Sequence, residues 1–231
     1  MATLSRMKLD IFPASCSHVS TIVFLHGSGD TSEGLREWLF SILRKRFCLP
    51  HSKIIFPSAP SRPYTPMNGA PSTVWFDRKR IAPIEPEDLE SIDPMCEEIG
   101  KVIQLEVDQG IPRNKIIVGG FSMGGCLALH VAYRFQQEIA GVFALSSFLN
   151  DNSKVYQDLA SSNCRRPPLF QCHGKVDPLV LYKWGETTKD LLTKAGVTCQ
   201  FHSYPRLYHE MNKDELDKLQ AWFDETFTSS S

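Results

Sequence analysis

The sequence lacks several features that mark particular classes of protein. No apolar run approaches the roughly 18 residues that span a bilayer, and no apolar core follows the first basic residues, as it would in a secretory signal. The net charge is −1, so no strong field is expected to attract nucleic acid or an anionic membrane. These absences predict a soluble cytoplasmic protein with no nucleic-acid partner and no stable membrane insertion.

The cysteines form neither a disulfide pattern nor a metal-binding pattern. Their number is odd, no two have metal-ligand spacing, and several lie in apolar runs, where a thiol acts as a small hydrophobe: Cys16, Cys48, Cys96, Cys126, Cys164, Cys172 and Cys199. Unpaired thiols fit a reducing compartment better than a disulfide framework.

Short apolar runs alternate with longer helical patterns. A chain of 231 residues with 42% hydrophobic residues can bury one sizeable core. Strands are expected at 21–25, 53–56, 115–118, 141–145, 169–172 and 200–204, and helices at 33–47, 88–109, 123–136, 181–195 and 213–227. This alternation predicts a single α/β domain over residues 1–231, with a mostly parallel sheet, helices on both faces, no large cap domain and a frayed tail at 228–231.

Residues 57–87 interrupt this rhythm with many prolines and little periodicity. Loops of this length are uncommon unless they serve a function. Two interpretations stay open at this point. The apolar residues of the segment line a site, or they cap the edge of the sheet.

The stretch Gly-Phe-Ser-Met-Gly at 120–124 carries the most specific chemical signal. It follows the apolar run 115–118 and precedes a small-residue helical run, in the order strand, turn, helix. Glycines on both sides of Ser122 relieve the steric conflict of a sharp turn, and such a turn lifts the hydroxyl above the sheet. Ser122 is therefore predicted to be a nucleophile.

A serine nucleophile needs a base and an acid that orients the base, and on such sheets both follow the serine in the chain. Asp177 follows the strand at 169–172, although it could also cap the next helix, and Asp151 after the preceding strand is a rival. Asp177 is the predicted acid, and His209, which follows the last strand, is the predicted base. His202 lies within that strand, and His173 is more typical of a structural, hydrogen-bonded histidine.

Two backbone N–H groups are needed to stabilise the oxyanion of acyl transfer. The residue after the nucleophile, Met123, provides one. The segment Leu-His-Gly-Ser-Gly-Asp at 25–30 follows an early strand, and the amide of Ser28 is predicted to be the second. A phosphate-binding loop is the weaker alternative, because no G-x-x-x-x-G-K-[ST] pattern is present. No metal or cofactor is expected.

These segments together resemble the acyl-protein thioesterase and lysophospholipase family of small α/β-hydrolases. The matching segments cover nearly the whole chain in order: 24–31, 56–60, 75–77, 110–112, 119–125, 140–146 and 171–180. Met123 and Ser28 depart from the main thioesterases, which places the chain nearer to the lysophospholipase-like branch. The resemblance implies the same Ser122, Asp177 and His209 and cytosolic hydrolysis of acyl esters and S-palmitoyl thioesters, with shorter acyl chains favoured in this branch.

The sequence thus predicts a serine hydrolase whose substrates are acyl esters or S-acylated proteins. Trp75, Phe148 and Leu179 are candidates for the substrate pocket, and the protein is expected to be a monomer or weak dimer. Two other functions remain open on the same fold. One is another small hydrolase activity, such as a peptidase, dienelactone hydrolase or lysophospholipase, and the other is a non-catalytic module that binds an acyl chain or a protein.

Overall fold

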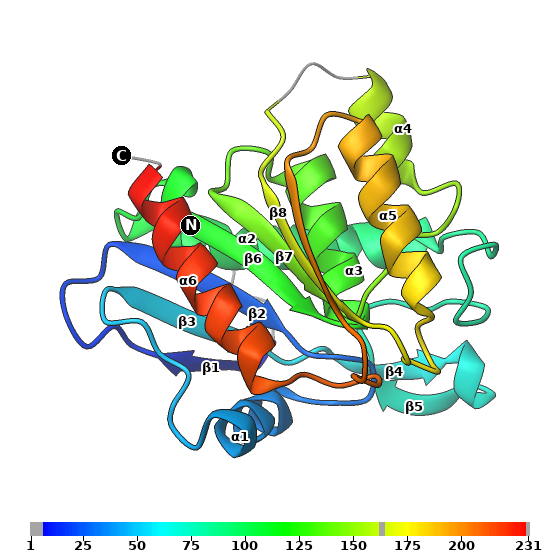
Figure 1. The fold of residues 1–231 in the computed structure, drawn as a ribbon, viewed down its shortest axis with the longest axis horizontal. Coiled ribbons are helices and arrows are strands. Elements are labelled where there is room, and N and C mark those ends of the chain that lie inside the picture. The colour runs from blue at the N-terminus through cyan, green and yellow to red at the C-terminus, as the bar shows by residue number, and fades with distance from the viewer. Residues whose placement is uncertain (1–6, 162–164, 230–231) are drawn as a thin grey trace.

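A seven-stranded sheet runs through the centre of the computed structural model, which describes residues 7–161 and 165–229 (Figure 1). Cys164 lies outside the described residues. Six of the seven strands of the sheet are parallel, and β1 runs antiparallel at one edge. In spatial order the strands are β1 (Leu9–Phe12), β3 (Ser52–Pro57), β2 (Ser20–Leu25), β6 (Ile116–Phe121), β7 (Gly141–Leu145), β8 (Leu169–Gly174) and β9 (Cys199–Tyr204).

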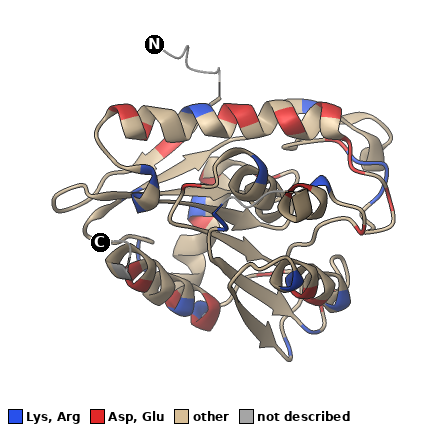
Figure 2. Cartoon of the chain, turned by 90° about the horizontal axis from the view of Figure 1, so that it is seen from above, with Lys and Arg blue, Asp and Glu red and all other residues tan. Residues whose placement is uncertain are grey.

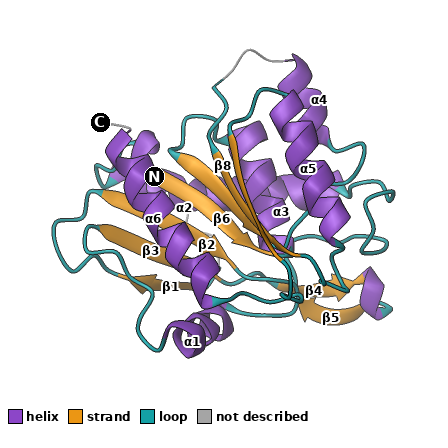
Figure 3. Cartoon of the chain, viewed as in Figure 1, coloured by secondary structure: helices purple, strands orange, loops and turns teal. Residues whose placement is uncertain are grey.

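Helices cover both faces of this sheet, as Figure 3 shows. One face packs against α2 (Leu89–Asp108), α3 (Met123–His130), α4 (Lys154–Ser161) and α5 (Tyr182–Lys194), and the other against α1 (Ser32–Leu43) and α6 (Lys213–Ser229). Successive residues of β2 point to opposite faces: Ile22 and Phe24 join the α1 and α6 core, whereas Val23 and Leu25 join the other. Burial on both faces explains why the strands read as unbroken apolar runs. The predicted mostly parallel α/β fold is confirmed.

Several boundaries differ from the prediction for local reasons. Helix α1 ends at Leu43 and not at 47, because Arg44 adopts a left-handed conformation with φ 56° and its N–H bonds to the Phe40 carbonyl. The helix after Ser122 loosens into a π-helical segment, η3 (Val131–Phe135). Helix α6 continues through Ser229, so the chain is helical at the start of the tail that was expected to fray, and residues 230–231 lie outside the described residues.

The segment at 57–87 is more ordered than its prolines indicate. It contains a hairpin of β4 (Ser61–Tyr64) and β5 (Ala70–Thr73), joined by a 3₁₀ turn, η1 (Thr65–Met67). Outside this segment, a second 3₁₀ turn, η2 (Arg113–Lys115), leads into β6. The hairpin is tied to the turn after β2, because the Gly29 N–H donates to the Thr73 carbonyl at 2.9 Å and the Thr73 hydroxyl donates to the Asp30 carbonyl at 2.6 Å.

Charged residues are spread over the helices and the loops, and those of the longest helix, α2, are mostly acidic (Figure 2). Within the described residues no helix is both long enough and apolar enough to cross a membrane.

Candidate active site

Ser122 occupies a strained turn between β6 and α3. Its backbone has φ 53° and ψ −119°, a region that residues with a side chain rarely adopt. A Cβ atom on Gly120 would lie 2.5 Å from the Leu25 carbonyl oxygen, and one on Gly124 would lie 2.4 Å from the same atom. Only glycine fits at either position, because the clash in both cases is with backbone. The glycines therefore let the turn press against the end of β2 while the serine projects above the sheet.

Three side chains form a continuous hydrogen-bonded chain at this edge of the sheet. The Oγ atom of Ser122 lies 3.0 Å from Nε2 of His209, and Nδ1 of His209 lies 2.7 Å from Oδ2 of Asp177. The three residues come from the ends of β6, β8 and β9. These are the distances at which a base can take a hydroxyl proton and a carboxylate can hold the base in place.

Asp177 is held as a carboxylate by its surroundings. Burial acts to raise its pKa, but hydrogen bonds from His209 and from the backbone N–H groups of Val180 and Leu179 outweigh burial and lower the pKa below its usual value. Both N–H groups donate to Oδ1 at 2.9 Å. The carboxylate is therefore ionised at neutral pH, and its second oxygen stays free to accept from His209.

The rival residues lie elsewhere. Asp151 is exposed on the β7–α4 loop, where its N–H donates to the Pro83 carbonyl. His202 packs against Phe170 on the α6 side of the sheet, with ring centroids 5.2 Å apart. His173 is fully buried, pairs through Nε2 with the Val180 carbonyl at 2.8 Å, and has a pKa lowered by burial. It therefore supports the loop that carries Asp177, which is the structural role expected for it.

A cavity of about 170 Å³ opens beside Ser122. It is smaller than the roughly 300–1,000 Å³ typical of drug-sized ligand pockets. Its lining includes Ser122, His209, Ser28, Met123, Phe148 and Leu179, together with Gly27, Asp30, Tyr64, Arg78, Ile81, Phe121, Cys126, Ser147 and Val180. Both predicted oxyanion residues and two of the three predicted pocket residues thus border the same space.

Trp75 does not line this cavity. Its side chain is fully buried, and its indole N–H donates to the carbonyl of His26 at 2.8 Å, with the two rings 4.8 Å apart. A large aromatic residue in a proline-rich segment is as suitable for supporting a turn as for contacting a substrate. Trp75 acts in the first way, behind the turn that carries Ser28.

Several cavity residues were missed by reasoning from the sequence. Cys126 is one turn of α3 after Ser122, so its spacing offered a signal. Tyr64 is one of the apolar residues of the 57–87 segment, for which a place at a site was one of the two open interpretations. Arg78 and Ser147 offered no signal, because only the folded chain brings them to Ser122. In the described part of the chain no group of three or more His, Cys, Asp or Glu side chains could hold a metal ion.

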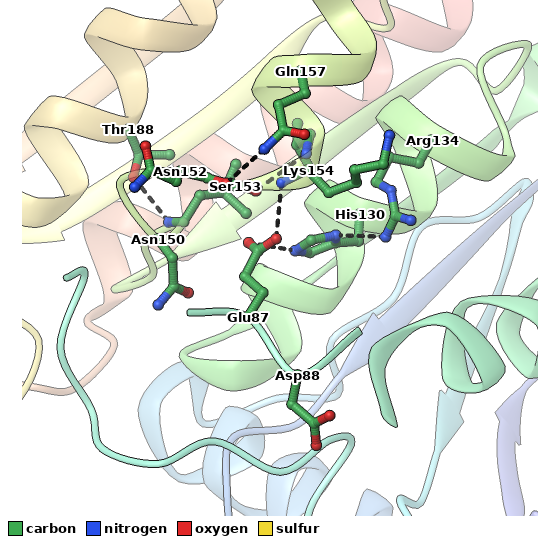
Figure 4. Close-up of polar contacts among 12 residues, drawn as sticks. Glu87, Asp88, His130, Arg134, Asn150, Asn152, Ser153, Lys154, Gln157 and Thr188 are labelled. Atoms are coloured by element: carbon green, nitrogen blue, oxygen red, sulfur yellow. Dashed lines mark hydrogen bonds and ion pairs between the residues drawn. The ribbon is translucent and has the colours of Figure 1, made fainter. Parts of the chain in front are cut away.

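The segment that carries Arg78 is anchored to α3 and α4 beyond it (Figure 4). Glu87 accepts a hydrogen bond from Nε2 of the buried His130 at 3.1 Å and one from the Lys154 N–H at 2.9 Å. Nδ1 of His130 in turn accepts from Arg134 at 3.1 Å. Asn150 donates to the Glu85 carbonyl at 2.7 Å. These contacts fix the end of the 57–87 segment.

Comparison with known proteins identifies a matching family and several relatives. A family model described as phospholipase/carboxylesterase matches residues 8–226. Lysophospholipase-like protein 1 of Mus musculus is 52% identical over 205 residues, which are 89% of this chain and 86% of that protein. Acyl-protein thioesterase 1 of Neurospora crassa is 34% identical over 97% of this chain and 94% of its own length.

Among solved structures, that of Zea mays acyl-protein thioesterase 2 superimposes with a TM-score of 0.79 at 29% identity, covering 95% of this chain and 99% of that one. The predicted resemblance to acyl-protein thioesterases and lysophospholipases is thereby confirmed. The chain belongs to the phospholipase/carboxylesterase family of α/β-hydrolases.

Proposed function

We propose that the chain is a serine hydrolase that cleaves esters and thioesters of short acyl groups. The observation that carries this proposal is the hydrogen-bonded chain from Ser122 through His209 to Asp177 at the wall of a cavity. The names of its relatives support the substrate class, since they include acyl-protein thioesterases and a lysophospholipase-like protein.

In the proposed mechanism Ser122 Oγ attacks the acyl carbonyl carbon while its proton passes to His209 Nε2. Asp177 keeps Nδ1 protonated, so that Nε2 is free to accept, and it stabilises the imidazolium that forms. The backbone N–H groups of Ser28 and Met123 stabilise the oxyanion. His209 then protonates the leaving alcohol or thiol, and a water activated by the same base releases the acid.

The small cavity supports a preference for short acyl chains over palmitoyl. We further propose that residues 1–231 act as one domain in the cytosol, as a monomer or weak dimer and without a cofactor. The six described cysteines are all unpaired, which suits a reducing compartment.

The test is hydrolysis of p-nitrophenyl esters from acetate to palmitate, combined with labelling by a fluorophosphonate probe. Wild type is expected to turn over the short esters and to be labelled, and Ser122→Ala to lose both. Ser61→Ala, on the exposed start of β4, is the matched control and retains both. Equal turnover by Ser122→Ala and wild type would overturn the assignment. A preference for palmitate would overturn the short-chain proposal alone.

A further inference from the structure

Arg78 lies in the cavity without a hydrogen-bonding partner for its inner nitrogen. Its Nε atom is buried and unpaired among the described residues, and none of the ion pairs in that part of the chain involves its guanidinium. Its neighbours Lys79 and Arg80 pair instead with Glu85. Arg78 as a whole is half-buried, and a buried N–H donor with no acceptor in its own protein is unfavourable unless something else interacts with it.

Aromatic rings account for part of that interaction. The guanidinium carbon of Arg78 lies 4.8 Å from the ring centroid of Phe76 and 5.7 Å from that of Phe148. Contacts with ring faces hold the flat group in place but use none of its N–H donors, which point outward in its own plane. Arg78 is therefore held in position and remains able to bind a planar anion such as a carboxylate through two N–H groups.

A second unpaired polar group borders the same cavity. Ser147 is 1% exposed, and its Oγ atom has no partner among the described residues. It directly precedes Phe148, whose ring faces Arg78. Asp30 is the only acid among the residues that line the cavity, and its Oδ1 lies 2.0 Å from the place where a Cβ on Gly34 would be, so it is turned toward the first turn of α1.

The position of His209 decides which part of a substrate meets Arg78. The leaving group must lie beside His209, because that residue protonates it, and the His209 ring packs against Phe121 at 4.8 Å. Arg78 packs instead against Phe148. Because His209 and Arg78 contact different rings of the cavity wall, we assign the leaving group to the side of His209 and the acyl group bound to Ser122 to the side of the guanidinium.

We propose that Arg78 and Ser147 form a subsite that binds a carboxylate at the far end of a short acyl group. The preferred substrates are then esters or thioesters of short dicarboxylic acids, and hydrolysis by Ser122 releases the free diacid. This inference rests on the proposed hydrolase function. The cavity of about 170 Å³ leaves room for a short linker between the two carboxyl carbons.

The test compares kcat/KM for p-nitrophenyl hemiesters of glutarate and adipate with the values for pentanoate and hexanoate, which match them in chain length. Spontaneous hydrolysis is subtracted in each case. Wild type is expected to favour the charged acyl groups, and Arg78→Met to lower the charged-to-uncharged ratio about 10- to 100-fold, as loss of charge-assisted hydrogen bonds in a buried site predicts. Arg78→Lys restores part of the ratio, and Ser147→Ala lowers it by a smaller factor.

Arg80→Met is the matched control, since Arg80 is on the same segment, pairs with Glu85 and does not line the cavity. It leaves the ratio as in wild type. If uncharged esters are hydrolysed through Ser122 but the ratio is the same in wild type and Arg78→Met, the carboxylate subsite is wrong and the hydrolase function stands. If Ser122 is neither labelled nor needed for turnover, the proposed function itself fails.

A second pair of substrates tests the location of the charge. Pentanoyl esters of 4-hydroxybenzoate and of its methyl ester differ by one charge on the leaving group only. The Arg78→Met substitution is expected to change kcat/KM for these two by the same factor. A selective loss for the charged leaving group would overturn the assignment of Arg78 to the acyl side.

Discussion

Replacing Asp177 by asparagine removes a charge from the hydrogen-bonded chain with almost no change in volume. In the carboxylate, Oδ1 accepts the N–H groups of Leu179 and Val180, and Oδ2 accepts from His209. An asparagine has one oxygen for these three donors. We expect that oxygen to stay with the two backbone N–H groups, because the opposite rotamer would set an NH₂ group against both of them.

The asparagine NH₂ group then faces Nδ1 of His209, which must become the acceptor. The imidazole proton moves to Nε2, the atom 3.0 Å from Ser122 Oγ, so His209 can no longer take the serine proton. Triads with the wrong tautomer lose about 10⁴ in kcat, or roughly 5 kcal/mol of transition-state stabilisation. We expect Asp177→Asn to lower kcat on p-nitrophenyl butanoate by a factor of this order, with KM little changed.

Steady-state kinetics and a thermal unfolding curve for the same preparation make this a decisive assay. Asp151→Asn is the control, because Asp151 is exposed after the neighbouring strand and takes no part in the hydrogen bonds that link Ser122, His209 and Asp177. A folded Asp177→Asn enzyme within about tenfold of wild type would refute the tautomer argument. So would an equal loss of activity in Asp151→Asn.

Three further predictions concern stability. Burial raises the pKa of Glu215 from 4.5 to about 8, so between these pH values the folded chain keeps a proton that the unfolded chain releases. The free energy of unfolding should therefore fall as pH rises through this window, by up to about 5 kcal/mol. Glu215→Gln should flatten that slope in urea unfolding at pH 5 to 9, and an unchanged slope would show that Glu215 is not its cause. Gly124→Ala should abolish folding or destabilise the chain by several kcal/mol, since its Cβ would press on the Leu25 carbonyl; a cooperative melt at the wild-type temperature would show that the turn can relax. Glu87→Gln should lower the free energy of unfolding by about 1–3 kcal/mol, because His130 and the Lys154 N–H donate to different oxygens of Glu87 and the amide NH₂ group would face one of these donors. Unaltered urea unfolding would show that the contact contributes nothing.

The candidate site could be read from the sequence where its residues follow a rule of the fold. Ser122 lies between glycines after an apolar strand, and Asp177 and His209 follow later strands whose ends share one edge of a parallel sheet. The wall of the cavity follows no such rule. Arg78 and Ser147 are 69 residues apart in the sequence, and nothing local distinguishes either one from a surface arginine or a turn serine.

The fold, too, could be predicted only where a segment follows a clear pattern. Strands buried on both faces are continuous apolar runs, so the six parallel strands could be found. Strand β1 has four residues at the antiparallel edge, with Asp10 among them, and gives almost no pattern. The β4–β5 hairpin was missed because prolines suppress strand propensity, although Pro63 and Pro71 sit opposite each other in an isolated two-stranded ribbon, where few ladder bonds are required of them.

Helix α3 supports two parts of the site that lie far apart in the sequence. Its first turn supports Ser122, and its last residue, His130, holds Glu87 and with it the end of the segment that carries Arg78. Eight helical residues span roughly 12 Å, so the turn that carries Ser122 and the contact that holds Glu87 lie at the two ends of one short helix. Residues 77–86 are thus fixed at both ends, by the buried Phe76 and by Glu87. Exchanging this stretch between relatives is a route to a different acyl preference that leaves the geometry of bond cleavage unaltered.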